Sequence, residues 1–263
     1  MGIGEHLETW DGWQASLAAL AWQIDLGVTE PVTDAPVNRY ELVVEVAKPL
    51  AQVMVAPPPM MQSVDPVAVA QVAAQNAATL SDLRDALGAY EHCELKRGAR
   101  NLVFADGNPA ARVLVLGEAP GRDEDREGKP FVGRAGQLLD RMFGAIGLSR
   151  HAEADSALYI TNVLPWRPPE NRDPTPDEMA MMRPFVERHI ALVDPDVIVV
   201  MGNTPLACLF REKGILRARG VWREALGRPV LPMTHPAYLL RNPEAKREAW
   251  ADLQALQERL GGR

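Results

Sequence analysis

Residues 112–125 read RVLVLGEAPGRDED, a short run of branched apolar residues that leads into a loop of glycine, proline and acid. Three similar apolar runs follow: ALYITNV at 157–163, DVIVVMG at 196–202 and PVLPMTH at 229–235. These runs are continuous rather than alternating in apolar residues, which is typical of strands buried on both faces of a parallel sheet. The sequence therefore predicts four parallel strands.

Helical segments separate and follow the predicted strands. They are AGQLLDRMFGAIG at 135–147, TPDEMAMMRPFVERHIALV at 175–193, NTPLACLFRE at 203–212 and EAKREAWADLQALQERL at 244–260. Alternation of strands and helices indicates a parallel sheet with helices on both faces. The predicted fold class is α/β, a three-layer α/β/α sandwich around a central four-stranded parallel sheet.

The N-terminal part has a different pattern. Residues 5–26 place tryptophan and leucine at helical spacing, and residues 27–62 are rich in Pro, Val and Ala. Residues 64–89 are Ala-rich and helical in pattern, with Asp65-Pro66 as the expected start. We therefore expect an acidic, Trp-containing helix plus linker over 1–62. The main domain is expected over 63–263, with a helical lead-in at 63–89.

Composition describes a globular chain of 263 residues, 47% hydrophobic and 24% charged. No apolar run approaches the roughly 18 residues that span a bilayer, and the first residues do not resemble a secretory signal. Two cysteines, Cys93 and Cys208, argue against a disulfide framework. We expect a cytoplasmic protein without a membrane partner.

The net charge of −7 is unevenly distributed. Residues 1–89 contain 11 acidic and 3 basic side chains, and residues 90–263 contain 24 acidic and 25 basic ones. The acidic balance therefore belongs to the N-terminal part, and charge alone neither supports nor excludes nucleic-acid binding.

In open parallel sheets, ligands bind outside the carboxyl ends of the strands. That rule selects four loops, at 117–134, 162–174, 202–205 and 235–243. They bring together a carboxylate at Glu118, a ring at Phe131, an amide at Asn162 and an imidazole at His235. An amide can read the edge of a base, a ring can stack on it, and an imidazole can donate to a developing anion. The set suits recognition and cleavage at a planar heterocycle.

Three segments in these loops resemble a known family. They are GEAPGRDEDREGKPFVGRAGQLLD at 117–140, YITNVLPWRPPENRDPTPDE at 159–178 and HPAYLLR at 235–241. In that order they resemble the uracil-DNA glycosylase superfamily, most closely its family-four enzymes, the thermostable or iron–sulfur type. The resemblance covers about residues 90–260. It implies a DNA N-glycosylase of base-excision repair, which removes uracil by hydrolysing the N-glycosidic bond of a flipped-out nucleotide.

The resemblance also implies roles for the base-contacting residues. Phe131 is expected to stack on uracil, and Asn162 to pair with its Watson–Crick edge and reject cytosine. His235 is expected to stabilise the departing uracil anion. Backbone N–H groups around Gly117 and Gly121 are candidates for binding uracil O2 or a phosphate.

Two further groups of residues follow from the same motifs. Glu118 is expected to orient water or support the positively charged sugar, with Asp125 or Glu124 sharing that work. The DNA-contacting residues are expected to be Tyr238, Leu239, Leu240, Arg241 and Arg167. Uracil-containing DNA is thus the implied partner of a monomeric protein, and residues 1–26 are a candidate surface for a protein partner.

The iron–sulfur cluster of the family-four pattern is predicted to be absent. That pattern has four cysteine ligands, and here the positions carry Tyr90, Cys93, Trp166 and Met182, while Cys208 matches none of them. One thiolate cannot hold a cluster that requires four. Trp166 and Met182 are expected to replace the metal with an apolar contact. The protein is therefore predicted to need no cofactor and no metal.

A second departure concerns the water-activating group. Relative to uracil glycosylases whose first motif is GQDPYH, Ala119 replaces an aspartate and Gly121 replaces the tyrosine that excludes thymine. The general base and the means of thymine exclusion therefore stay open. The alternatives are a glycosylase with altered base preference and a non-catalytic module that binds uracil or abasic sites. A third, a relative trapped covalently on DNA, is disfavoured because no His-bearing insertion follows Arg134.

Overall fold

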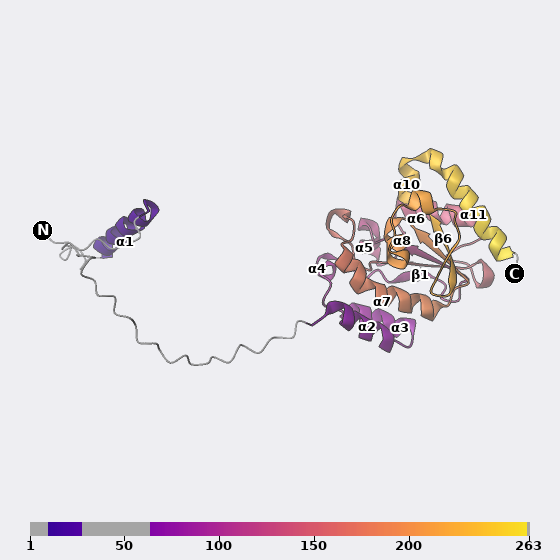
Figure 1. Cartoon of the computed structure of the whole chain (residues 1–263), viewed down its shortest axis with the longest axis horizontal. Coiled ribbons are helices and arrows are strands. Elements are labelled where there is room, and N and C mark those ends of the chain that lie inside the picture. The colour runs from indigo at the N-terminus through magenta and orange to yellow at the C-terminus, as the bar shows by residue number, and fades with distance from the viewer. Residues whose placement is uncertain (1–9, 28–63, 262–263) are drawn as a thin grey trace, which may run out of the picture. The chain divides into compact units, whose positions relative to one another are not determined.

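The computed structural model describes residues 10–27 and 64–261. The chain divides into two compact units, Met1–Met61 and Gln62–Arg263, and each is described separately. In the first, α1 (Trp10–Asp25) is the helix expected within 5–26 (Figure 1). The side chains of Trp13, Leu17 and Trp22 are exposed. Residues 1–9 and the expected linker, apart from Gly27, lie outside the described residues.

The second unit is built on a six-stranded sheet with the order β1-β3-β2-β4-β6-β5. The four expected strands are found and are parallel: β2 (Val113–Gly117), β3 (Leu158–Asn162), β4 (Val197–Met201) and β6 (Arg228–Met233). The expected count of four is corrected by two antiparallel edge strands, β1 (Ala105–Gly107) and β5 (Arg223–Ala225). Each edge strand has three residues and no apolar run, so no periodic signal marks it.

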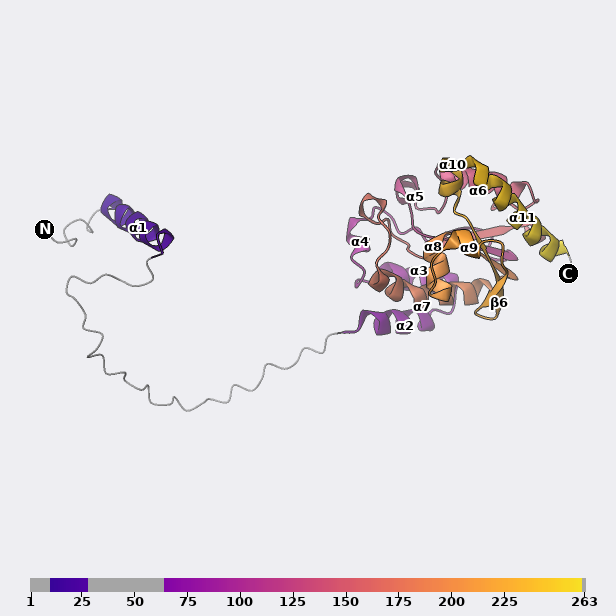
Figure 2. The same ribbon diagram turned by 45° about the horizontal axis from the view of Figure 1, so that its top comes forward.

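Helices cover both faces of this sheet, which confirms the α/β class (Figures 1 and 2). One face packs against α6 (Arg134–Gly144), α10 (Pro236–Arg241) and α11 (Lys246–Gly261). The other packs against α7 (Pro176–Val193), α8 (Asn203–Phe210) and α9 (Ile215–Ala218). Successive strand residues enter opposite cores, as Val113 and Val115 do on one face and Leu114 and Leu116 on the other.

The helical lead-in is two helices rather than one. Asp65 begins α2 (Pro66–Asn76) by accepting a hydrogen bond from the Val67 N–H at 2.9 Å. The expected helix over 64–89 is interrupted after residue 76 because Thr79 starts α3 (Leu80–Ala89) with a reciprocal capping box to Asp82. Both helices pack on the outer side of α7.

Short elements complete the unit and were not predicted. They are α4 (Leu95–Gly98), α5 (Arg122–Glu127) and the 3-10 turns Ala154–Ser156, Pro169–Asn171 and Pro243–Ala245. Among the helices of the described ranges, none combines the length and apolar character that crossing a membrane requires.

A third apolar cluster joins α2, α3 and α7 to the segment after β3. It contains the four positions at which the resemblance implies cluster ligands. They are Tyr90, Cys93, Trp166 and Met182, each no more than 4% exposed. The Tyr90 ring meets the Phe185 ring edge-on at 5.5 Å. The four positions are thus brought together by close packing of side chains.

Met182 tests how much this packing contributes to stability. Its side chain is fully buried, so Met182→Ala should lower the free energy of unfolding by about 2–5 kcal/mol through lost burial and a residual cavity. Chemical denaturation measures the change. Val72→Ala, on an exposed side chain of α2, is the control and should change stability by less than about 0.5 kcal/mol. Equal effects from both variants would show that the cluster is loosely packed.

Candidate active site

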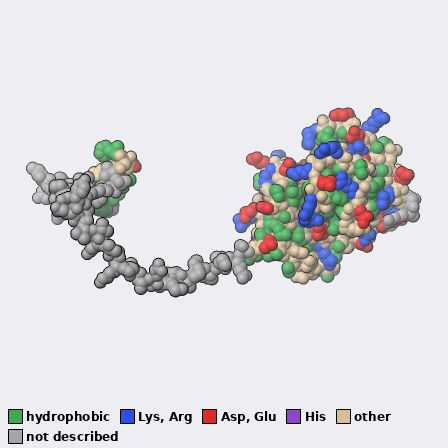
Figure 3. Space-filling model, viewed as in Figure 1, with side chains coloured by type: hydrophobic (Ala, Val, Ile, Leu, Met, Phe, Trp, Pro, Cys, Tyr) green, Lys and Arg blue, Asp and Glu red, His purple; other side chains and the backbone are tan. Residues whose placement is uncertain are grey.

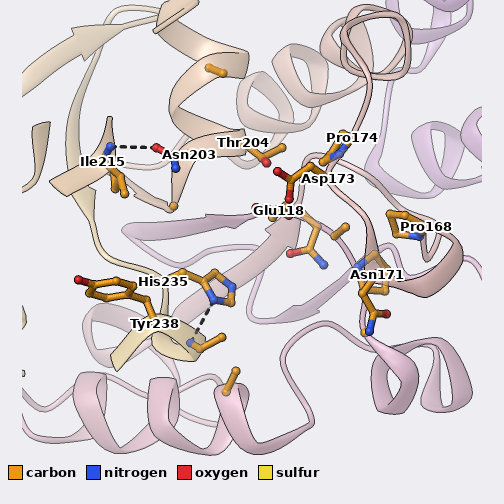
Figure 4. A pocket seen from close by; sticks show the side chains of 18 of the residues that line it. Glu118, Pro168, Asn171, Asp173, Pro174, Asn203, Thr204, Ile215, His235 and Tyr238 are labelled. Atoms are coloured by element: carbon orange, nitrogen blue, oxygen red, sulfur yellow. Dashed lines mark hydrogen bonds between the residues drawn. The ribbon is translucent and has the colours of Figure 1, made fainter. Parts of the chain in front are cut away.

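A pocket of about 690 Å³ opens at the carboxyl ends of the parallel strands. The chain leaves β2 for β3 on one side and later crosses to β4 on the other, which creates a crevice beside the end of β2. Loops after all four parallel strands line the pocket, and Figure 4 shows His235 across from Glu118. The sequence rule therefore located the pocket correctly.

Phe131 forms one wall from a constrained backbone. Its φ angle is +53°, in the left-handed region that a bulky residue rarely adopts. A side chain at Gly117 would collide with both the Phe131 ring and the Asn162 amide oxygen, so ring and amide lie against the same glycine. A side chain at Gly136 would collide with the Phe131 backbone. Gly117 thus makes room for the Phe131 ring, and Gly136 makes room for the Phe131 backbone.

Two polar atoms in the pocket wall are unsatisfied. Within the described residues, Asn162 Oδ1 and Thr234 Oγ1 are the buried side-chain oxygens and nitrogens that have no hydrogen-bond partner. Both residues line the pocket. Buried polar groups are nearly always paired in folded proteins, so each exception requires an explanation. A ligand that supplies a donor to Asn162 is the simplest one.

His235 lies at the end of β6 and caps α10. Its Nδ1 accepts a hydrogen bond from the Ala237 N–H at 3.1 Å, so the neutral ring carries its proton on Nε2. Burial, assisted by the positive charge of Arg241, lowers the pKa of His235 to about 4. The ring lies 5.4 Å from the Phe131 ring, centre to centre. A neutral donor therefore stands beside the aromatic wall.

Glu118 supplies a carboxylate on the opposite side, grouped with Thr204 and Asp173 in Figure 4. Burial raises the pKa of Glu118, and the charge of Asp173 raises it further, while a hydrogen bond with the Thr204 side chain partly offsets the rise. A carboxyl group with a raised pKa near a cleft is a candidate for acid–base work.

Two neighbouring acids in the segment after β2, Glu124 and Asp125, lie on different sides of the chain. Glu124 lines the pocket and accepts hydrogen bonds from the Val132 and Gly133 N–H groups at 3.0 and 2.9 Å. Asp125, the other acid expected to share the work of Glu118, accepts instead from the Arg100 N–H at 2.8 Å and lies outside the pocket lining. This corrects the expectation for Asp125, because the helical turn of α5 directs neighbouring residues to different sides.

Some of the expected site residues line the pocket, and others do not. The pocket lining includes Glu118, Gly121, Phe131, Asn162, His235, Tyr238 and Arg241, but not Gly117, Asp125, Arg167, Leu239 or Leu240. Leu239 is fully buried in the core under α10, which corrects its expected contact with DNA. Leu240 is partly buried against the same core. Arg167 donates to Asn171 Oδ1 at 2.8 Å and so supports the 168–174 loop.

Basic side chains are present at the pocket. Lys213 and Arg241 are exposed and line it, and no acidic side chain in the described ranges forms an ion pair with either. On the face drawn in Figure 3, Lys and Arg are interspersed with Asp and Glu, in keeping with the near-neutral charge of residues 90–263. Two exposed cations without an ion pair in the described ranges therefore lie at the pocket.

The side chains at the four positions where the resemblance implies cluster ligands are poor ligands for an iron–sulfur cluster. Burial raises the pKa of Tyr90 to about 12, so its hydroxyl stays protonated, and it donates to the Pro66 carbonyl at 2.8 Å. Burial also raises the pKa of the Cys93 thiol. Trp166 has no atom that can replace a thiolate ligand, and the Met182 thioether carries no charge.

Several residues of the site were not found from the sequence. Thr204, Thr234 and Asp173 line the pocket. Asp173 lies within the second family motif but was given no role there, and Thr204 and Thr234 belong to none of the three motifs. Thr204 lies in the loop at 202–205 that the strand-end rule selected. Its position at a strand end therefore indicated a site residue, although its residue type did not. Arg150 has no such signal, because its partners come from three separate segments: β1, the loop at Pro130-Phe131, and α6.

A pocket with one aromatic wall and an edge of amide and imidazole groups suits a planar, hydrogen-bonding heterocycle. Residues 104–254, more than half of the chain, match the family model described as the uracil DNA glycosylase superfamily. The protein belongs to this superfamily.

Relatives agree with this assignment. The chain is 42% identical to a type-4 uracil-DNA glycosylase of Thermotoga maritima over 153 residues, which is 57% of this chain and 77% of the relative. It is 36% identical to the type-4 enzyme of Archaeoglobus fulgidus over 194 residues, 70% of this chain and 94% of that protein. A type-5 uracil-DNA glycosylase of Thermus thermophilus is 31% identical over 134 residues, 47% of this chain and 61% of the relative.

The lowered pKa of His235 predicts a distinct titration. In NMR its ring should be half-protonated near pH 4, far below the ordinary value of about 6.5. As pH falls, His235 is therefore protonated in the unfolded chain before it is protonated in the folded one. This difference lowers the free energy of unfolding between about pH 6.5 and 4. His235→Asn removes that titration, so it should lose less free energy of unfolding between about pH 7 and 5 than the parent. A midpoint near 6.5 would contradict the burial argument.

Proposed function

We propose that the protein is a uracil-DNA glycosylase that hydrolyses the N-glycosidic bond of a flipped-out deoxyuridine. The observation that carries the proposal is the unpartnered, buried Asn162 Oδ1 in the pocket wall. Uracil offers an N3–H donor to that oxygen, whereas cytosine presents an acceptor at N3. A buried acceptor left facing another acceptor is costly, so the site favours uracil.

The remaining groups match the parts of this reaction. The Phe131 ring stacks on the base, and His235 Nε2–H donates to uracil O2. As the C1′–N1 bond breaks, its electron pair passes to the base, and the negative charge develops at the oxygen that His235 contacts. A neutral donor fixed in place can stabilise such an anion without a prior protonation step.

Glu118 is assigned to the sugar side of the bond. Its carboxylate, held by Thr204, stabilises the positive charge that develops at C1′ and orients the water that attacks it. Water adds its oxygen to C1′ and releases one proton, and the departing uracil anion takes up one. Asp125 has no part in this step, because its carboxylate holds backbone N–H groups outside the pocket.

The DNA strand is assigned to the pocket mouth. Lys213 and Arg241 provide cations for phosphates, which dominate affinity for DNA. Tyr238 and Arg241 lie on the pocket side of α10. They contact the opened duplex, a role that the sequence had assigned to Leu239 as well. The expectations of a monomer, a cytoplasmic location and a protein partner for residues 1–26 stay predictions.

Uracil release tests the function directly. The purified protein should release uracil from a labelled uracil-containing oligonucleotide in multiple turnovers, and Asn162→Ala should reduce kcat/KM on the order of 100-fold or more. The matched control is Asn108→Ala, in the turn before β2 at the opposite end of the strands. It should keep the parent's activity.

The outcomes separate the rival readings. Tight binding of uracil DNA without release would overturn the proposed reaction and favour a non-catalytic damage-binding module, the reading that Ala119 supports. Faster release of another deaminated base would show an altered preference. Equal losses in Asn162→Ala and Asn108→Ala would remove Asn162 from base recognition.

We also propose that the protein works without an iron–sulfur cluster. The support is the donor set: one protonated thiol, a phenol engaged with Pro66, an indole and a thioether, all closely packed. Protein expressed with excess iron and purified without oxygen should contain well under one iron per chain and show no visible absorption band. Uracil release should not change after treatment with a chelator. Four irons per chain, lost together with activity, would contradict the proposal.

A further inference from the structure

The peptide groups on both sides of Phe131 are held by one buried arginine. Arg150 lies in the turn between α6 and β3, with a side chain 4% exposed. Its Nη1 donates to the Pro130 carbonyl at 2.9 Å and its Nη2 to the Phe131 carbonyl at 3.0 Å. Two consecutive carbonyls are therefore fixed by a single planar guanidinium.

Two carboxylates balance the charge of Arg150. Nη1 also donates to Asp106 at 3.1 Å, and Nε donates to Asp140 at 2.9 Å. Asp106 belongs to edge strand β1 and Asp140 to α6. The guanidinium is thus oriented by two rigid elements, which fixes the positions of the donors that reach the loop.

The other side of the same loop is held by an acid. Glu124 accepts from the N–H groups of Val132 and Gly133, the two residues that follow Phe131. The Arg150 cation thus holds the loop by its carbonyl groups on one side. The Glu124 anion holds it by its N–H groups on the other. Between these contacts, Phe131 keeps a φ of +53°, which a phenylalanine adopts only when its surroundings determine it.

Arg150 is not part of the pocket lining, and the proposed reaction does not use it. Stability alone does not explain why an arginine occupies this position, because a buried ion pair adds little to the free energy of unfolding compared with apolar packing of the same volume. Its two loop contacts both end on the peptide groups that flank the stacking ring.

We infer that Arg150 is a positioning residue, which holds the Phe131 ring in its base-stacking orientation before DNA binds. The inference rests on the proposed function, because it assigns Phe131 to the base. Without the guanidinium, the segment 130–133 loses its two fixed carbonyls and Phe131 can leave the left-handed conformation. The ring must then be ordered again each time a base enters, which weakens binding.

A double-mutant cycle tests this inference. Arg150→Met, Phe131→Ala and the double variant are compared with the parent for kcat/KM of uracil release and for inhibition by free uracil. We expect Arg150→Met to lower kcat/KM and to weaken uracil inhibition by about tenfold each. In the Phe131→Ala background the same change should alter both by less than about twofold, because residues that act through one contact are not additive.

Controls separate positioning from general damage to the fold. Arg112→Met removes another partly buried ion pair, with Asp196 at 2.7 Å, from the opposite end of β2, and should keep both kinetic values. Arg150→Lys retains the charge but not the planar fork, and should lose activity to an intermediate degree. It replaces Arg150→Met in the cycle if that variant does not fold.

Hydrogen exchange gives a measurement that does not depend on catalysis. In Arg150→Met the Val132 and Gly133 amides should exchange at least tenfold faster than in the parent, with the β4 amides unchanged. If the parent releases no uracil, the proposed function fails and the exchange result still decides on Arg150. Additive kinetic losses, or exchange that rises equally in β4, would overturn the inference.

Discussion

The absence of a side chain at Gly117 is the constraint on which the pocket depends. Strand β2 ends there, and its backbone allows the Phe131 ring and the Asn162 amide to approach the same point. Any larger residue would separate the ring and the amide that the proposed function assigns to the face and the edge of one base. The central position of β2 then brings the ends of β3, β4 and β6 to the same crevice. Recognition thus depends on one close backbone approach in the middle of the sheet.

The parts of the fold that were predictable are those with a strong one-dimensional pattern. Apolar runs marked the four buried strands, and strand-end position marked Glu118, Asn162 and His235, which all line the pocket. Strands β1 and β5 were missed because each has only three residues, none of them buried, and so short a segment carries no periodic signal. The sequence left Asp125 and Glu124 as alternatives for a different reason. Adjacent acids in one helical turn face different sides, and only the partners of each, Arg100 or Gly133, decide which one faces the pocket.

The same reasoning explains the error at α10. The sequence HPAYLLR suggested a continuous contact with DNA, but a helix can present only one side to a partner. Leu239 faces the core, and Tyr238 and Arg241 face the pocket. The helix also fixes His235, whose Nδ1 is occupied by the Ala237 N–H. Burial of Leu239 anchors α10, and α10 in turn holds the imidazole of His235 at the pocket. The same helical turn therefore contributes to stability and orients the hydrogen-bond donor.

The short edge strands have a consequence for the behaviour of the protein at high concentration. A long, flat outer strand offers a row of unpaired peptide groups that can template addition of another chain. Here β1 and β5 end each side of the sheet after three residues, and β5 begins with the charged Arg223. The neighbouring strand β6 carries a proline at residue 229, which has no N–H to donate. The sheet thus ends in short edges that are poor templates for the addition of a strand from another chain.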